Sequence, residues 1–167
     1  MLNKKTIFFT IFVILFLSPL AQTEGFESPK AFTEYIYENY SEENFSEVYN
    51  NFAAELKREL EKKVYLDFQK ENFEKYSLEY TDIKVGDAKE IEFKEVKDKF
   101  DYAVDFGNYY MLQVEYLLKF NHFGKREEES GKKVYLRKIV DTFQIFWNPE
   151  TTSNDQSAKV EADQDGQ

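Results

Sequence analysis

The chain has 167 residues, with 22 basic and 32 acidic side chains and a formal net charge of −10. This negative charge argues against nucleic acid or an anionic lipid surface as a partner, because both would repel the protein. There is no cysteine, so an exported form would have no disulfide, and its stability would depend on a core rich in the 17 Phe and 12 Tyr.

The N-terminal segment has the composition of a secretory signal peptide. Lys4 and Lys5 precede the uncharged run 6–17, and small residues follow around Ala21. The run is shorter than the about 20 residues that a membrane-spanning helix needs. We expect residues 1–25 to be a cleaved signal peptide and the protein to be secreted or to lie at the extracytoplasmic face of the cell envelope. An uncleaved N-terminal anchor is the alternative. Loss of the two lysines would bring the net charge to −12.

The residues after this segment predict helices. Ser28 has the side chain of a helix N-cap, and Pro29 suits the first helical position because its missing N–H needs no partner there. Apolar residues then recur at spacings of three and four, which is typical of an amphipathic helix. The same spacing predicts a second helix over 41–60 and a third, shorter helix over 67–76.

After Tyr76 the apolar period changes from 3.6 to 2, which predicts strands. The first strand is expected over 78–85. Another strand is expected to begin at 91. Its alternation of apolar and polar residues shifts by one position before the strand continues to 106. A bulge near 94–99 would repair the slip, and two short strands with a charged connection are the alternative.

The remaining chain predicts the rest of the sheet. Gly107 and Asn108 indicate a turn, and the following strand, 111–120, is apolar on both faces and therefore central. Residues 122–132 are expected to form an exposed hairpin loop, and 134–147 the last strand. Pro149 ends the pairing because proline has no N–H to donate.

The predicted fold class is α+β, with two to three N-terminal helices packed on a curved, mostly antiparallel sheet. The expected domain spans 26–149. Residues 150–167 are polar, acidic and nearly free of aliphatic side chains, so they are expected to be a disordered tail.

The stretch SPKAFTEYIYENYSEENFSEVYNNFAAEL, followed by a third helix and a bent sheet, resembles the NTF2-like superfamily, also called cystatin-like or SnoaL-like. With the closing FQIFWNP, it looks most like small extracytoplasmic modules that occur alone or precede the transpeptidase domain of penicillin-binding proteins. The resemblance spans about residues 28–149 and implies a cone-shaped fold. It does not carry over a transpeptidase role, since no catalytic domain follows residue 149.

A cone with large apolar side chains at its mouth would suit a hydrophobic ligand. The residues expected to bind it are Tyr109, Tyr110, Phe143, Phe146 and Trp147. The competing interpretation is that these aromatic side chains only fill the core.

The enzymatic alternative involves the single histidine. Enzymatic members of the superfamily use a His–Asp pair as acid and base, which implies His122 with Asp105 or Asp141 here. The competing interpretation is a surface histidine and solvent-facing aspartates. The chain has none of the patterns GxSxG, HExxH, Walker loop, CxxC or EF-hand, and neither a metal nor a cofactor is expected.

The leading hypothesis is therefore a secreted, non-catalytic domain that binds a cell-envelope protein or a small apolar ligand, with a homodimer as a further expectation. Contact with the membrane is expected only through an uncleaved signal segment. The alternative is a cavity enzyme of the isomerase or hydrolase type that uses His122 or an inward-facing aspartate.

Overall fold

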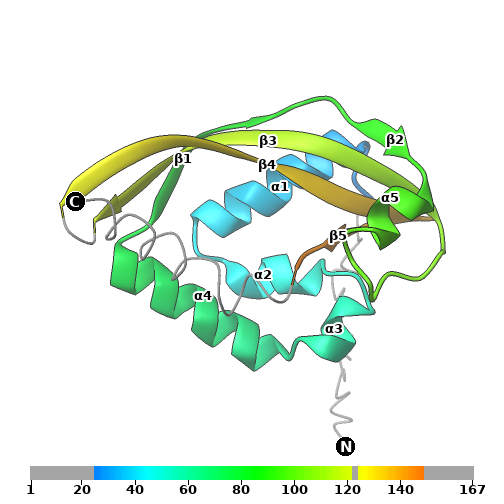
Figure 1. The fold of residues 1–167 in the computed structure, drawn as a ribbon, viewed down its shortest axis with the longest axis horizontal. Helices are drawn as coiled ribbons and strands as arrows, with labels where there is room; N and C mark the ends of the chain where they lie inside the picture. Colours follow the sequence, from blue (N-terminus) through cyan, green and yellow to red (C-terminus); the bar gives the residue numbers. More distant parts are fainter. Residues whose placement is uncertain (1–24, 122–123, 149–167) are drawn as a thin grey trace, which may run out of the picture.

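The computed structural model describes residues 25–121 and 124–148, which form an α+β fold (Figure 1). The helices before the first strand lie against an antiparallel sheet of five strands that does not close into a barrel. Nearly all of the predicted signal peptide, His122 and the predicted tail lie outside the described residues.

In the described part of the chain, four helices precede the sheet, and a fifth lies between its second and third strands. They are α1 (Pro29–Ser41), α2 (Phe45–Asn50), α3 (Leu56–Glu59), α4 (Lys62–Tyr76) and α5 (Phe93–Lys97). The predicted start of α1 is confirmed, because the Ser28 Oγ accepts a hydrogen bond from the Ala31 N–H at 3.1 Å. Pro29 occupies the first helical position.

The prediction of one continuous helix over 41–60 was wrong. The chain turns at Glu43, which has a φ of 61°, and forms the short helices α2 and α3. Between them the backbone leaves the helix to pair with the end of the sheet. The Ala53 N–H donates to the Ile145 carbonyl at 3.0 Å, and the Ile145 N–H donates to the Asn51 carbonyl at 2.9 Å. These tertiary hydrogen bonds replace the helical ones. Helix α4 also begins earlier than expected.

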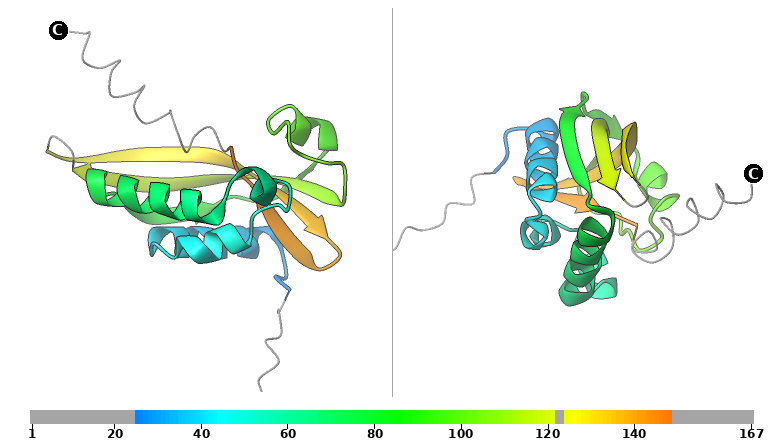
Figure 2. Two further views of the ribbon diagram at one scale, coloured as in Figure 1. Left: turned by 90° about the horizontal axis from the view of Figure 1, so that it is seen from below. Right: turned by 90° about the vertical axis from the view of Figure 1, so that its left-hand side faces the viewer.

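The sheet has the order β1-β3-β4-β5, and β2 also pairs with β3. Its strands are β1 (Glu79–Val85), β2 (Lys89–Ile91), β3 (Asn108–Asn121), β4 (Lys125–Ile139) and β5 (Thr142–Phe146). The long β3–β4 hairpin arches over α1, α2 and α4 in Figure 1. The side views in Figure 2 show these helices on one side of the hairpin, with α5 apart from them.

The bulged strand predicted through residue 106 is not present, and neither is the alternative of two short strands. Strand β2 ends at Ile91, helix α5 follows, and residues 98–107 contain no strand. The apolar residues Phe93, Val96 and Phe100 are three and four positions apart, which is helical spacing. The apparent slip in alternation was therefore a change of secondary structure.

Two further predictions in the C-terminal half were wrong. The expected loop 122–132 is mostly strand, because β4 begins at Lys125, and Glu127 pairs with Lys119 of β3. The expected single strand 134–147 is a hairpin that turns at Val140 and Asp141. Val140 has a φ of 55°, which a β-branched residue rarely adopts, so the sequence pattern did not indicate a turn here although Asp141 is a common turn residue.

The core between helices and sheet is largely aromatic, as the composition predicted. Its most buried side chains include Phe32, Phe45, Phe52, Tyr65, Leu112 and Ile145. Ring pairs such as Phe52–Tyr65, with centroids 4.9 Å apart, connect α4 to the segment between α2 and α3. Such pairs add about 0.5–1.5 kcal/mol each beyond the burial of their area.

Among residues 25–121 and 124–148, one ion pair is buried. The Arg137 Nη1 and Nη2 atoms donate to the two carboxylate oxygens of Glu55 at 2.7 and 2.8 Å. Arg137 is 2% exposed and Glu55 8% exposed. Arg137 also donates to the Gln144 side chain at 2.6 Å, and its guanidinium carbon lies 5.5 Å from the centre of the Phe146 ring. This pair connects the segment before α3 to β4 and β5.

Candidate functional site

An open pocket of about 350 Å³ lies between α4 and the sheet. Helix α4 contributes Phe68, Gln69 and Asn72, and Tyr80 comes from β1. Strand β4 contributes 132–134, and the chain at and after the end of β5 contributes 145–148. The walls are thus mostly aromatic and aliphatic, with a few polar groups, which is the usual make-up of a small-molecule site.

Trp147 lies at this pocket although it follows the last paired residue of β5. The hydroxyl of Tyr102 accepts a hydrogen bond from the Trp147 N–H at 3.0 Å and donates one to the Trp147 carbonyl at 2.6 Å. A single side chain therefore satisfies both backbone groups that the sheet leaves unpaired. The Trp147 ring is held between Phe52 and Tyr40, with centroid distances of 6.3 and 6.0 Å.

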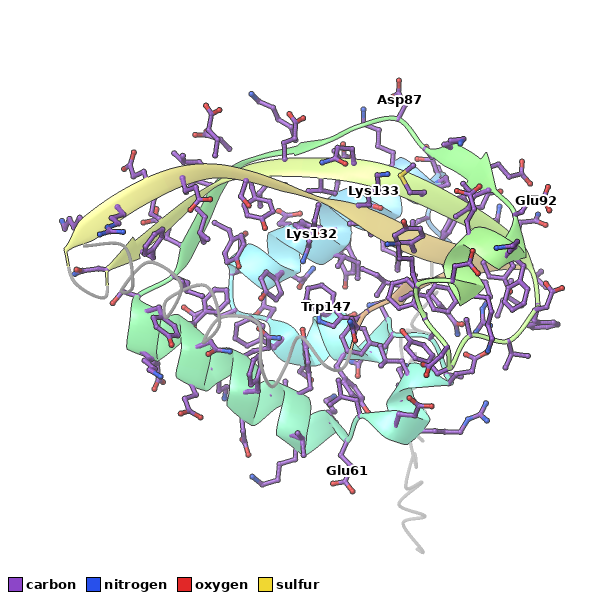
Figure 3. All side chains as sticks on the ribbon, in the orientation of Figure 1. Glu61, Asp87, Glu92, Lys132, Lys133 and Trp147 are labelled. Atoms are coloured by element: carbon purple, nitrogen blue, oxygen red, sulfur yellow. The ribbon has the colours of Figure 1, made fainter. Side chains whose placement is uncertain are left out.

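Two lysines line the pocket, Lys132 and Lys133, and the Lys132 side chain lies over its aromatic rings. The Lys132 Nζ lies 3.8 Å from the centre of the Trp147 ring, 5.4 Å from that of Tyr37 and 5.9 Å from that of Tyr40. Figure 3 shows Lys132 and Trp147 between the β3–β4 hairpin and α4. No carboxylate in the described part of the chain forms an ion pair with Lys132.

The environment of Lys132 disfavours its charge. Burial lowers the pKa of the Lys132 ammonium from its usual 10.5 to about 7. The three ring faces oppose this change, because their negative quadrupoles favour a cation. At neutral pH, Lys132 is therefore uncharged in a substantial fraction of the molecules.

The polar groups of the neighbouring helices are also neutral. The Tyr40 hydroxyl donates a hydrogen bond to the buried Oε1 of Gln69 at 2.9 Å. Burial raises the pKa of Tyr37, Tyr40 and Tyr80 above the usual value for a phenol. These phenols consequently carry no charge that could compensate the Lys132 ammonium at neutral pH.

The five aromatic residues predicted to bind a ligand lie in different places. Phe146 and Trp147 line the pocket. Tyr109 lines a second, acidic hollow together with Asp105. Phe143 is stacked on Phe32 in the core, with ring centroids 5.6 Å apart, and the ring centroids of Tyr110 and Phe143 are 6.3 Å apart. Neither Phe143 nor Tyr110 lines the pocket.

The residues of the enzymatic alternative are likewise separated. Asp105 lies in the second hollow, and Asp141 is exposed at the turn between β4 and β5. His122 is outside the described residues. Within 25–121 and 124–148, no group of three or more His, Cys, Asp or Glu side chains could hold a metal ion. Nor does that part of the chain contain a helix long and apolar enough to span a membrane.

Sequence reasoning missed Lys132 as a site residue because it placed 122–132 in a loop. A usable signal was nevertheless present. Val134 and Leu136 are buried, and alternation extended backwards by two residues puts Lys132 on the same face as these two. A lysine at an inward position of a strand is a recognisable departure from the usual burial preferences.

Comparison with known proteins adds no family assignment. No protein-family model matches the sequence, and no curated protein matches it significantly.

Proposed function

We propose that the chain is an exported, non-catalytic binding domain of NTF2-like architecture that takes a small apolar ligand into the pocket between α4 and the sheet. The observation that carries the proposal is the pocket itself. Its volume of about 350 Å³ falls within the range of roughly 300–1,000 Å³ that is typical of ligand sites.

The walls favour an aromatic or otherwise planar apolar ligand. Phe68, Tyr80 and Phe146 offer ring surfaces from three different elements, and Leu78 adds an aliphatic one. Removal of apolar surface from water stabilises binding by about 25 cal/mol per Å². The few polar groups, among them Gln69, are available to orient the ligand.

The NTF2-like assignment is supported by the arrangement of the elements. Helices α1, α2 and α4 lie under the arch of an antiparallel sheet that does not close, as the resemblance implied (Figure 1). Export is supported by the basic and apolar order of the first residues. Binding of an envelope protein and formation of a homodimer stay predictions.

The aromatic pocket favours binding over catalysis. Neither Asp105 nor Asp141 lines it, so neither can act as an acid or base on a ligand held there. We therefore infer that the domain retains its ligand unchanged.

Trp147 allows this function to be tested, because it is the only tryptophan and lines the pocket. Titration with the neutral probe N-phenyl-1-naphthylamine is expected to quench Trp147 emission in a saturable manner. Asn72→Phe places a ring inside the pocket and should weaken binding by about tenfold or more, which corresponds to about 1.4 kcal/mol.

The matched control is Glu74→Phe, which adds the same ring to an exposed position of α4 that does not line the pocket. This variant should bind the probe as the unchanged protein does. Equal binding by Asn72→Phe and the unchanged protein, or no saturable quenching at all, would refute the proposed function.

A further inference from the structure

The Lys132 ammonium lacks an oxygen partner in the part of the chain that the structure describes. It forms no ion pair and no hydrogen bond there, and its contacts are the rings of Trp147, Tyr37 and Tyr40. Buried or half-buried cations in proteins are normally paired, because an unpaired one loses its hydration. Ring faces replace only part of that hydration, with about 2 kcal/mol for a desolvated cation.

The position of this cation makes it available to a ligand. Lys132 lines the same pocket as the aromatic walls, and its Nζ lies over Trp147 rather than on the outer surface. An anionic oxygen that entered the pocket would meet N–H donors that no described residue uses. The apolar remainder of the same molecule would then lie against Phe68, Tyr80 and Phe146.

We propose that the pocket binds an organic monocarboxylate with an aromatic or other apolar body, and that the Lys132 ammonium pairs with its acid group. This inference rests on the proposed function and adds the chemical class of the ligand. Two parts of the ligand are recognised separately, the apolar body by ring surfaces and the acid group by one half-buried cation.

The charge of the whole protein restricts the ligand to a weakly charged one. The formal net charge is −10, so highly charged anions such as nucleotides are repelled as they approach. A monocarboxylate, with a single negative charge, experiences the least repulsion of any anion. Its attraction to the Lys132 ammonium in the pocket offsets this repulsion. Pairing of the carboxylate with a desolvated ammonium is a charge-assisted hydrogen bond, which is about twice as strong as a neutral one.

The geometry also predicts how binding depends on pH. Several groups face Lys132 from the elements packed around it, and at neutral pH the aromatic and amide groups among them are uncharged. They are Tyr37 and Tyr40 of α1, Gln69 and Asn72 of α4, Tyr80 of β1, Lys133 at the rim and Trp147. Burial holds the pKa of Lys132 near 7, so its amine is mostly neutral above that pH. Binding of a carboxylate above pH 7 must therefore be accompanied by uptake of a proton by Lys132.

The test is isothermal titration calorimetry with two ligands of matched shape, 2-naphthoate and the neutral 2-naphthalenemethanol. At pH 6.5 the unchanged protein is expected to bind the carboxylate about 10- to 100-fold more tightly than the alcohol. The carboxylate affinity should fall by up to about tenfold per pH unit above pH 7, whereas the alcohol affinity should not change. Two buffers of different ionisation enthalpy should reveal proton uptake at pH 8.

Two variants assign the effect to Lys132. Lys132→Met should lose the preference for the carboxylate and still bind the alcohol, which also shows that its pocket is folded. Lys138→Met is the matched control, because Lys138 lies on the same strand with its Nζ 5.3 Å from the centre of the Phe143 ring and does not line the pocket. This variant should keep the preference.

Equal binding of the two naphthalenes by the unchanged protein would overturn the carboxylate inference and leave the proposed function standing. A preference that survives in Lys132→Met would overturn the role of this lysine. If neither naphthalene nor N-phenyl-1-naphthylamine binds, the proposed function fails together with the inference.

Discussion

Replacement of Glu55 by alanine is expected to lower the free energy of unfolding by about 3–5 kcal/mol, because it leaves the Arg137 charge buried without its partner. Both residues are almost fully buried, and two hydrogen bonds of 2.7 and 2.8 Å join them. The side chain of Gln144 and a Val104 carbonyl 3.4 Å away would remain as weak substitutes for the carboxylate. Urea-induced unfolding at pH 7 measures the loss.

The control for this prediction is the double variant Glu55→Leu with Arg137→Met, which removes both charges and keeps an apolar filling. It should recover most of the stability, since apolar replacement of a buried pair is often neutral or stabilising. A loss of less than about 1 kcal/mol in Glu55→Ala would contradict the buried pair, because exposed ion pairs contribute about that much.

The same pair makes stability sensitive to acid. Burial raises the pKa of the Glu55 carboxyl, but the hydrogen bond and charge of Arg137 outweigh it, so the pKa lies below its usual 4.5. A carboxyl with a lowered folded pKa contributes stability that is present above the unfolded pKa and is lost as pH falls through the folded pKa. Below pH 4.5 the free energy of unfolding should therefore fall less steeply in the double variant than in the unchanged protein.

Replacement of Lys132 by methionine is expected to raise the free energy of unfolding at pH 6, although it abolishes the proposed carboxylate site. A lysine whose folded pKa is lowered destabilises the fold fully below that pKa, and the penalty declines as pH rises towards the unfolded value. The change from 10.5 to about 7 sets an upper limit of about 5 kcal/mol. The three ring faces and partial exposure reduce the expected gain to about 1–3 kcal/mol.

The dependence on pH distinguishes this effect from a simple gain of apolar packing. Between pH 7 and 9 the unchanged protein should become more stable relative to Lys132→Met, so that the advantage of the variant declines. Unfolding curves at pH 6, 7, 8 and 9 give the comparison, with Lys138→Met as the variant of equal charge. An advantage of Lys132→Met that is the same at every pH would show that the lysine is not desolvated.

The helix–sheet division was predictable because it depends on the spacing of apolar side chains. The cap at Ser28 and the switch to strands after Tyr76 both follow from local chemistry. The boundaries that failed depend on tertiary contacts. The break after α2 exists because the backbone around Phe52 pairs with Ile145, some ninety positions away, and no local pattern encodes this.

The candidate site was predicted only in part, for a related reason. Trp147 and Phe146 could be chosen from the terminal strand, but Lys132 was hidden in a charged stretch that resembled a loop. Strand β4 is exposed over residues 125–129, so it shows no apolar alternation until it reaches its buried part at Val134. Its register is set instead by fourteen residue pairs with β3, from Asn108↔Lys138 to Asn121↔Lys125.

The most direct test of the whole account is the titration of Lys132 itself, followed by NMR through the 13Cε signals of isotopically labelled lysine. A desolvated Lys132 should give one signal with a midpoint near pH 7, which is missing from Lys132→Met. The protons of this signal should be shifted upfield by the Trp147 ring, whose centre lies 3.8 Å from the Nζ. A signal that is removed by this substitution but titrates near the ordinary lysine value of about 10.4 would contradict the desolvated pocket cation.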